Sequence, residues 1–187
     1  MPPTVSVICL CYNHEAYVRA AINSILNQTY GDFELLFVDD GSTDNSVALA
    51  REFADPRIKV LTTDHRGPGY ASAMALNQAR GEYVALMSSD DVCLSHRFEA
   101  QHKQMREMSL DALFSRPTLI DDGGRSLPET AWPVFFKRSF RTTEDLYEKL
   151  FFRGNFLCAT SAMIRRDVAT RFGWASAGML QLQDYLL

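Results

Sequence analysis

Two adjacent carboxylates, Asp90 and Asp91, are the side chains of this sequence best suited to chemistry. They follow a short apolar run, residues 83–87, and two hydroxyl residues, Ser88 and Ser89. Adjacent carboxylates repel each other, so a fold tolerates them best in water, against hydrogen-bond donors or on a cation. Oxygen ligands of this kind suit a hard divalent ion, Mg²⁺ or Mn²⁺, that is shared with a phosphate. The alternative is a solvated turn that caps the following helix, because short motifs often match by chance.

Polar and aromatic side chains also follow three other apolar runs, at residues 5–10, 33–38 and 58–61. They are Cys11, Tyr12 and Asn13 after the first run, Asp39, Asp40, Gly41 and Ser42 after the second, and Asp64, His65 and Arg66 after the third. If the runs are parallel strands, these side chains share the edge of the sheet where open α/β folds bind ligands. A carboxylate there can accept a hydrogen bond from a base or a ribose hydroxyl, and the Tyr12 ring can stack on a base.

The hydrophobic pattern predicts the elements that position these residues. The four apolar runs predict four strands, and helical periodicity follows each of them. The first three helices are expected at about 14–26, 46–53 and 70–79, with Asn13 as the N-cap of the first. This alternation predicts an α/β fold with a parallel, doubly wound open sheet, flanking helices and right-handed crossovers.

The rest of the chain has a less regular pattern. The expected elements are a polar helix at about 95–108, extended chain at 112–120, a turn at 121–124, a helix from Thr142 to about Phe152, a strand within 156–164 and a short helix at 167–172. The composition changes near residue 110 without a linker. We therefore predict two halves of one domain, residues 1–110 and residues 111–187, of which the second is smaller and mixed.

The composition of the 187 residues narrows the class of protein. A net charge of −4 does not suggest a nucleic-acid partner. The four cysteines lack the Cys-x-x-Cys spacing of a zinc site, which favours free thiols in a reducing compartment. No apolar run approaches the ~18 residues that a transmembrane span needs, and no signal peptide is visible. We therefore predict a cytoplasmic protein, a location that includes the inner face of the membrane.

A glycine-rich phosphate motif is absent after the first apolar run. Dinucleotide-binding and P-loop proteins place Gly-x-Gly-x-x-Gly or Gly-x-x-x-x-Gly-Lys-Ser/Thr there. This sequence has CYNH at residues 11–14 instead. A phosphate must therefore be bound in another way, and most simply through a metal ion held by Asp90 and Asp91.

Short segments spread over nearly the whole chain resemble the family 2 glycosyltransferases, which have the GT-A fold, a Rossmann-like and mostly parallel open sheet. The segments are VSVI at 5–8, YN at 12–13, SILNQT at 24–29, FEL at 33–35, VDDGSTD at 38–44, ALNQARGEY at 75–83, SDD at 89–91, GN at 154–155, SAMIR at 161–165, FG at 172–173 and QDY at 183–185. In this resemblance, SDD is a variant of the Asp-x-Asp motif of the family.

The resemblance implies roles for the residues of a donor site. Tyr12 would hold the base of a nucleoside diphosphate sugar by its ring, and Asp40 would hold it by its carboxylate. Asp39 would order their loop, Asp90 would face the ribose, and Asp91 would bind Mn²⁺ or Mg²⁺ on the diphosphate. The other residues expected in this site are Asn13, Arg66 and Ser89. The structural alternatives are a core aromatic for Tyr12 and a helix cap for Asp39.

The implied reaction transfers the sugar, with inversion at its anomeric carbon, to a hydroxyl of a carbohydrate or lipid-linked acceptor. UDP is the commonest donor nucleotide of the family, while GDP and dTDP sugars stay open. Asp184 would act as general base on the acceptor hydroxyl, with a surface carboxylate as the alternative. Two departures stand out: Gln183 replaces a usual Glu, and GWAS at 173–176 replaces Gly-Phe-Asp-Glu. Since the chain ends three residues after Asp184, we expect a fragment of a longer protein.

Two other functions stay open at this point. The missing Glu is compatible with a nucleotide-sugar-binding module that has no transfer activity. A nucleotidyltransferase also has carboxylates at strand ends, although such enzymes usually carry a glycine-rich basic loop after the first strand. The aromatic and basic stretch 132–140 is compatible with an acceptor wall and with packing under a loop.

Overall fold

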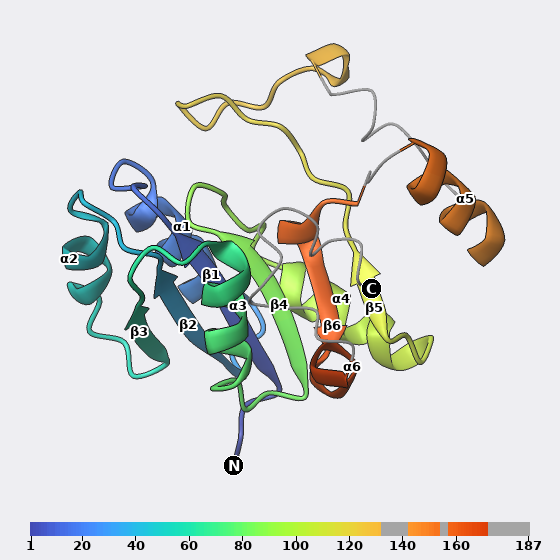
Figure 1. The fold of residues 1–187 in the computed structure, drawn as a ribbon, viewed down its shortest axis with the longest axis horizontal. Coiled ribbons are helices and arrows are strands. Elements are labelled where there is room, and N and C mark those ends of the chain that lie inside the picture. Colours follow the sequence, from blue (N-terminus) through green and yellow to red (C-terminus); the bar gives the residue numbers. More distant parts are fainter. Residues whose placement is uncertain (132–141, 154–156, 172–187) are drawn as a thin grey trace.

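The structure is a computed structural model, and it describes residues 1–131, 142–153 and 157–171. A six-stranded sheet of order β3-β2-β1-β4-β6-β5 forms its centre (Figure 1). The strands are β1 (Val5–Cys11), β2 (Phe33–Asp39), β3 (Ile58–Thr62), β4 (Tyr83–Ser88), β5 (Ala112–Phe114) and β6 (Ala162–Arg165). The first four are parallel, β6 is antiparallel to β4, and β5 is antiparallel to β6. The predicted parallel sheet is therefore confirmed, and the second half of the chain extends it with a mixed edge.

The helices lie close to the predicted positions. They are α1 (Val18–Leu26), α2 (Ser46–Arg51), α3 (Pro68–Leu76), α4 (Arg97–Glu107), α5 (Thr143–Arg153) and α6 (Arg166–Arg171), with 3₁₀ turns η1 (Glu129–Ala131) and η3 (Ala159–Ser161). Residues 112–120 were expected to be extended, but the strand covers only the first three of them. Ile120 then pairs with Ser126 across the predicted turn. Within the described residues, no helix is both long enough and apolar enough to span a membrane.

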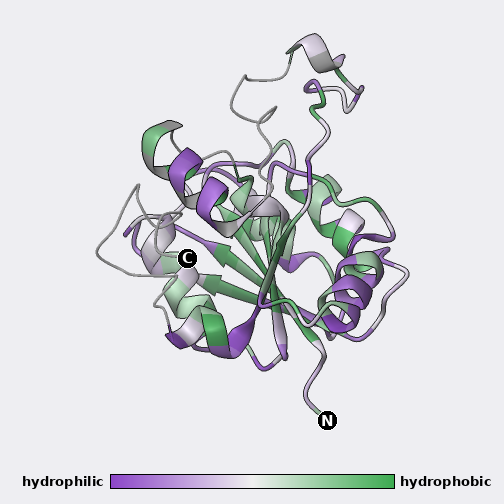
Figure 2. Cartoon of the chain, turned by 90° about the vertical axis from the view of Figure 1, so that its right-hand side faces the viewer, coloured by the Kyte–Doolittle hydropathy of each residue, from purple (hydrophilic) through white to green (hydrophobic). Residues whose placement is uncertain are grey.

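Helices cover both faces of the sheet, and strand side chains alternate between two cores. α1, α2 and α4 pack on one face, in a core that includes Phe37 and Phe98. α3 and α6 pack on the other face, in a core that includes Ile8 and Leu36. Figure 2 shows hydrophobic strands at the centre and hydrophilic residues on the outer helices. β1, β2 and β4 are buried along almost their whole length, as expected for parallel strands covered on both faces.

The predicted N-cap of the first helix is wrong, and the alternative in which Asp90 and Asp91 cap a helix is not what the structure has. Asn13 is not the N-cap of α1, because the helix begins at Val18 and Tyr17 precedes it as N-cap. The chain instead turns at Asn13 with a left-handed φ of 55°, and the side chain bonds the loop after β2. The carboxylates after β4 do not cap the following helix either, since α4 begins at Arg97 with His96 as N-cap.

A buried polar cluster closes the amino-terminal edge of the sheet. Glu34 accepts hydrogen bonds from the Ser6 hydroxyl at 2.7 Å and from the Arg80 backbone N–H at 2.9 Å. The Arg80 side chain also donates to Glu34, and the Gly81 N–H donates to Ser6. A Cβ at Gly81 would lie 2.6 Å from the Ser6 nitrogen, so only glycine fits here. Burial by itself would raise the pKa of Glu34, but the bonds from Ser6 and Arg80 outweigh it and lower the pKa.

The lowered pKa of Glu34 predicts a pH-dependent contribution to stability. This contribution is complete above the unfolded pKa of about 4.3 and is lost as the pH falls through the lower folded value. We expect Glu34→Gln to reduce the free energy of unfolding by about 1–2 kcal/mol at pH 7, and by less at pH 3. Urea denaturation at both pH values measures this. Glu107→Gln on the exposed end of α4 is the control, and an equal loss for Glu34→Gln at both pH values would contradict the prediction.

Candidate active site

A cavity of about 400 Å³ opens at the carboxyl edge of the sheet, between β1 and β4. This is where the strand order reverses, because the chain continues from β1 to β2 on one side and returns to β4 on the other. Open α/β sheets bind ligands at such a switch point. The walls come from the ends of β1 and β4, the start of α3 and the 3₁₀ turn η3, and they include Tyr12, His14, Asp40, His65, Ser72 and Thr160.

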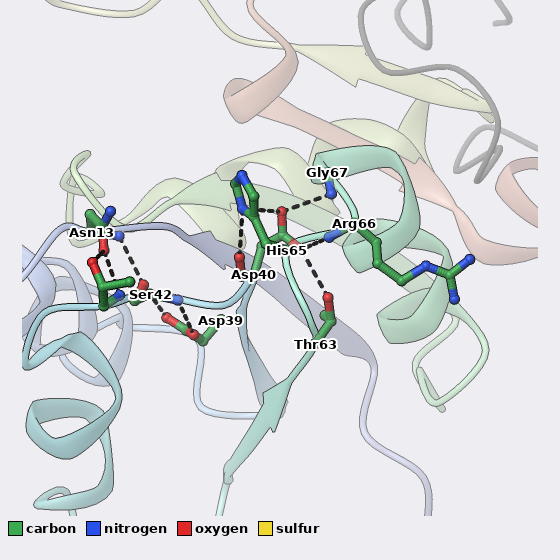
Figure 3. A network of polar contacts seen from close by, with 9 residues as sticks. Asn13, Asp39, Asp40, Ser42, Thr63, His65, Arg66 and Gly67 are labelled. Atoms are coloured by element: carbon green, nitrogen blue, oxygen red, sulfur yellow. Dashed lines mark hydrogen bonds and ion pairs between the residues drawn. The ribbon is translucent and has the colours of Figure 1, made fainter.

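The Asp40 carboxylate is the most heavily bonded group of this cavity (Figure 3). One oxygen accepts from the Thr63 hydroxyl and the Arg66 N–H, and the other accepts from the Gly67 N–H, each at 2.9 Å. Asp40 is only 6% exposed, so these donors offset much of the cost of burying its charge. Since a carboxylate has about four acceptor positions, these donors leave about one, and His65 Nδ1 lies 3.6 Å from the oxygen that the Gly67 N–H bonds.

Tyr12 and His65 form a stacked pair in the cavity wall. Their ring centroids are 4.2 Å apart and the planes are inclined by 23°. His65 Nδ1 lies 3.0 Å from the Asp40 carbonyl oxygen, which can only accept, so Nδ1 carries the proton. Gly41 keeps the backbone close to His65, because it has φ of +77° and a Cβ would lie 2.8 Å from the His65 nitrogen. One face of Tyr12 is thus covered by the His65 ring, which Asp40 and Gly41 hold in place.

Asp39 and Asn13 link the loop after β1 to the loop after β2. Asp39 accepts from the Ser42 N–H at 2.8 Å and from the Ser42 hydroxyl. The Asn13 N–H donates to the Ser42 hydroxyl, and the Asn13 side chain accepts from the Thr43 N–H, both at 2.8 Å. These bonds are drawn in Figure 3. Asn13 directly follows Tyr12 in the chain, so its bonds to Ser42 and Thr43 fix the loop that carries Tyr12.

Asp90 and Asp91 lie in the turn after β4, and both residues are exposed. Protein atoms around the carboxyl of Asp91 raise its pKa, a hydrogen bond with Thr160 lowers it, and the charge of Asp90 raises it again. The contact with Thr160 brings Asp91 to the cavity, because Thr160 is part of the wall. The net upward shift means that burial and the repulsion from Asp90 outweigh the groups that favour the charged form of Asp91, and a bound cation would favour that form further.

The donor set tests whether a metal ion fits here. Among the residues that the structure describes, no group of three or more His, Cys, Asp and Glu side chains is arranged to hold a metal ion. These residues therefore do not offer a metal site in which protein side chains supply all the ligands. Mg²⁺ is usually held by one or two carboxylates together with waters and substrate phosphates. Asp90 and Asp91 fit that second kind, in which a bound phosphate completes the coordination.

Of the predicted site residues that the structure describes, only Tyr12 and Asp40 are part of the cavity wall, and Asn13, Asp39, Asp90 and Asp91 lie in the adjoining loops. Ser89 is fully buried beneath its rim and contacts His14. The Arg66 guanidinium lies over the Tyr70 ring at 3.8 Å, and within the described residues Arg66 is not part of the wall. Asp184 lies outside the described residues, as do Gln183 and the aromatic stretch 132–140.

Sequence reasoning assigned no role to three residues of the wall. His14 and His65 follow strands one and three, so their place at the edge was visible from the sequence. Thr160 gave no such signal, because it reaches the cavity through η3, far from β4 in the chain.

This sheet with its antiparallel edge and its cavity at the switch point is the GT-A type of glycosyltransferase fold. The first 349 residues of TarS from S. aureus, solved with UDP, superpose with a TM-score of 0.75 at 24% identity, over 98% of this chain and 53% of that one. The mannosyltransferase PcManGT from Pyrobaculum calidifontis, solved with GDP-Man and Mn²⁺, gives a TM-score of 0.64 at 20% identity, over 92% and 47%. At these identities the likeness establishes the fold.

The chain belongs to glycosyl transferase family 2, whose sequence pattern matches residues 6–173. The glucosyltransferase WfgD of Escherichia coli, which acts on GlcNAc-diphosphoundecaprenol with UDP-Glc, is 36% identical over 119 residues, 63% of this chain and 47% of that protein. The uncharacterized glycosyltransferase MJ1057 of Methanocaldococcus jannaschii is 31% identical over 189 residues, 98% of this chain and 62% of that protein. The chain thus spans about half the length of the curated relatives that it matches.

The hydrogen bonds of Asp40 predict a double effect of its substitution. Asp40→Asn replaces an acceptor by a donor that faces a backbone N–H, so we expect a loss of about 1–3 kcal/mol in the free energy of unfolding. The β3–α3 loop is the part released, so amide hydrogen exchange should rise at Arg66 and Gly67 before the sheet is affected. Asp111→Asn, on the exposed edge of β5, is the control. Unchanged protection of Arg66 and Gly67 would contradict the prediction.

Proposed function

We propose that this chain is the donor-binding part of an inverting, metal-dependent glycosyltransferase that uses a nucleoside diphosphate sugar, with UDP as the nucleotide. The observation that carries the proposal is one cavity whose wall holds the aromatic ring of Tyr12 and the buried carboxylate of Asp40. An exposed carboxylate pair adjoins this wall, because Asp91 is hydrogen-bonded to the wall residue Thr160. The ring and the buried carboxylate complement the base of such a donor, and the carboxylate pair complements its ribose and its metal-bound diphosphate.

The base has a defined place in this proposal. Tyr12 offers an aromatic face, and Asp40 offers an acceptor for the imide N–H of uracil. The loops around these residues are bonded to one another through Ser42, Thr63 and Gly67. Little order has to be gained on binding, which favours affinity.

The diphosphate would lie against the carboxylate pair at the rim. Asp91 would hold the divalent ion and Asp90 the ribose, and the ion, when bound, offsets charge on the departing diphosphate. The solved complex of PcManGT with GDP-Man and Mn²⁺ supports this use of a metal by the fold. Asp184 is proposed as the base that removes the proton of the acceptor hydroxyl, whose class is carbohydrate or lipid-linked. The lipid-linked sugar acceptor in the name of WfgD supports a location of this reaction at the inner face of the membrane.

A nucleotide-sugar-binding module without transfer activity is the second candidate. Gln183, where a Glu is usual, is the feature that favours it. The protein that contains the whole family region separates the two: release of UDP from UDP-sugar in the presence of acceptor supports transfer, while tight binding without release supports the module. The family assignment argues against the nucleotidyltransferase alternative.

Ligand-induced stabilisation tests the donor assignment directly. At a concentration of about 100 Kd, UDP with Mn²⁺ should raise the melting temperature by about 5–10 °C, because a ligand that binds only the folded chain stabilises it by mass action. The measurement is a thermal shift series with UDP, GDP and dTDP, each with Mn²⁺ and with EDTA. A chain that none of the nucleotides stabilises would overturn the proposed function.

Substitution of Asp91 tests the metal assignment. We expect Asp91→Asn to abolish the increase that Mn²⁺ adds to UDP affinity, since the amide removes the charge that holds the ion. UDP affinity in EDTA should stay within about twofold of the wild type, because the base contacts are unchanged. Isothermal titration calorimetry measures both values, with Glu107→Gln as control. Equal Mn²⁺ enhancement in Asp91→Asn and wild type would reject the metal role of Asp91.

A further inference from the structure

His14 connects three segments at the rim of the cavity. Its backbone N–H donates to the Ser46 hydroxyl at 2.9 Å, at the first residue of α2. Its Nδ1 lies 2.8 Å from the hydroxyl of Ser89, a residue with no exposed surface. The ring is part of the cavity wall, and its side chain is only 26% exposed. The imidazole is therefore anchored on one side and faces the ligand space on the other.

The hydrogen bond of Nδ1 with Ser89 bears on whether the other ring nitrogen of His14, Nε2, carries a proton. The thiol of Cys11 contacts the same Ser89 hydroxyl, and burial raises the pKa of Cys11, so the thiol keeps its proton. The Ser89 hydroxyl, which has one hydrogen to donate, can give it to Nδ1 of His14. A neutral imidazole that accepts at Nδ1 carries its proton on Nε2. His14 then presents an N–H to its open side.

Asp90 lies on that open side. His14 Nε2 is 3.8 Å from one carboxylate oxygen of Asp90, and the Ser88 hydroxyl donates to the other oxygen. The Asp90 side chain is 46% exposed, so without these two groups it would be free to rotate in solvent. The hydroxyl of Ser88 thus holds an orientation of the carboxylate in which its second oxygen faces Nε2 of His14.

We propose that His14 is a positioning residue of the donor site, which orients the Asp90 carboxylate for the ribose of a bound nucleoside diphosphate. The inference rests on the proposed function in one respect, namely that Asp90 meets the donor. His14 acts through Asp90, so it contributes to nucleotide affinity only while the Asp90 carboxylate is present. The hydrogen bond with Ser89 makes this possible, because it holds the direction of the ring, and the proposal requires that Nδ1 accepts in it and that Nε2 carries the proton.

A double-mutant cycle on UDP affinity tests this dependence. His14→Asn keeps an amide near the Ser89 hydroxyl but removes the donor that faces Asp90, and we expect UDP binding to weaken by about threefold to tenfold. His14→Gln places an amide N–H near the Nε2 position, and it should recover most of the affinity. In an Asp90→Asn background, His14→Asn should cause no further loss. Calorimetry in saturating Mn²⁺ gives the four affinities, with His96→Asn at the N-terminus of α4 as control.

Additive losses in the two variants would overturn the proposal, because His14 would then act by a route other than Asp90. Wild-type affinity in His14→Asn would overturn it as well. Nitrogen NMR of the imidazole gives a second test that needs no ligand: we expect the Nε2–H form for His14 in the free chain, and the Nδ1–H form would reject the inference. A chain that binds no UDP but shows the Nε2–H form contradicts the proposed function while supporting the orientation of Asp90 by His14.

Discussion

The buried carboxylate of Asp40 is the constraint on which the cavity depends. Its charge lies at the end of β2, where it is almost inaccessible to water, so the fold must supply donors for it. They come from Thr63, Arg66 and Gly67, all in the connection from β3 to α3. Satisfying one carboxylate therefore fixes the loop that carries His65, and His65 covers one face of Tyr12. The positions of His65 and Tyr12 in the cavity wall therefore depend on the Asp40 carboxylate.

The two edges of the sheet use buried carboxylates in opposite ways. At the amino-terminal edge, Glu34 is surrounded by Ser6 and by the side chain and backbone of Arg80. At the carboxyl edge, Asp40 is part of the cavity wall, and burial together with the charge of Asp90 raises the pKa of Asp91. A polar group whose bonding is complete stabilises the fold, whereas one with capacity left is available to a ligand.

The course of the strands was predictable because burial on both faces leaves a continuous apolar run, as in residues 33–38 and 83–87. The helix starts were less predictable. Asn13 has the chemistry of an N-cap, but its side chain bonds Thr43 of another loop, and a contact between residues 30 apart has no local signature. Arg66 likewise follows a strand, yet its guanidinium packs on Tyr70 rather than in the cavity wall. Tertiary partners outweighed local preference at both positions.

The sequence by itself determined the α/β class, the four parallel strands and the collection of Tyr12, Asp40, Asp90 and Asp91 at one edge, because these follow from the period of the hydrophobic pattern and from the direction of parallel strands. Only the tertiary structure decided which of these groups are already bonded and which are open to a ligand. It alone placed His14 between Ser89 and Asp90, and brought Thr160 to Asp91. Such contacts join segments far apart in the chain, and their geometry exists only once the sheet and its two cores have packed.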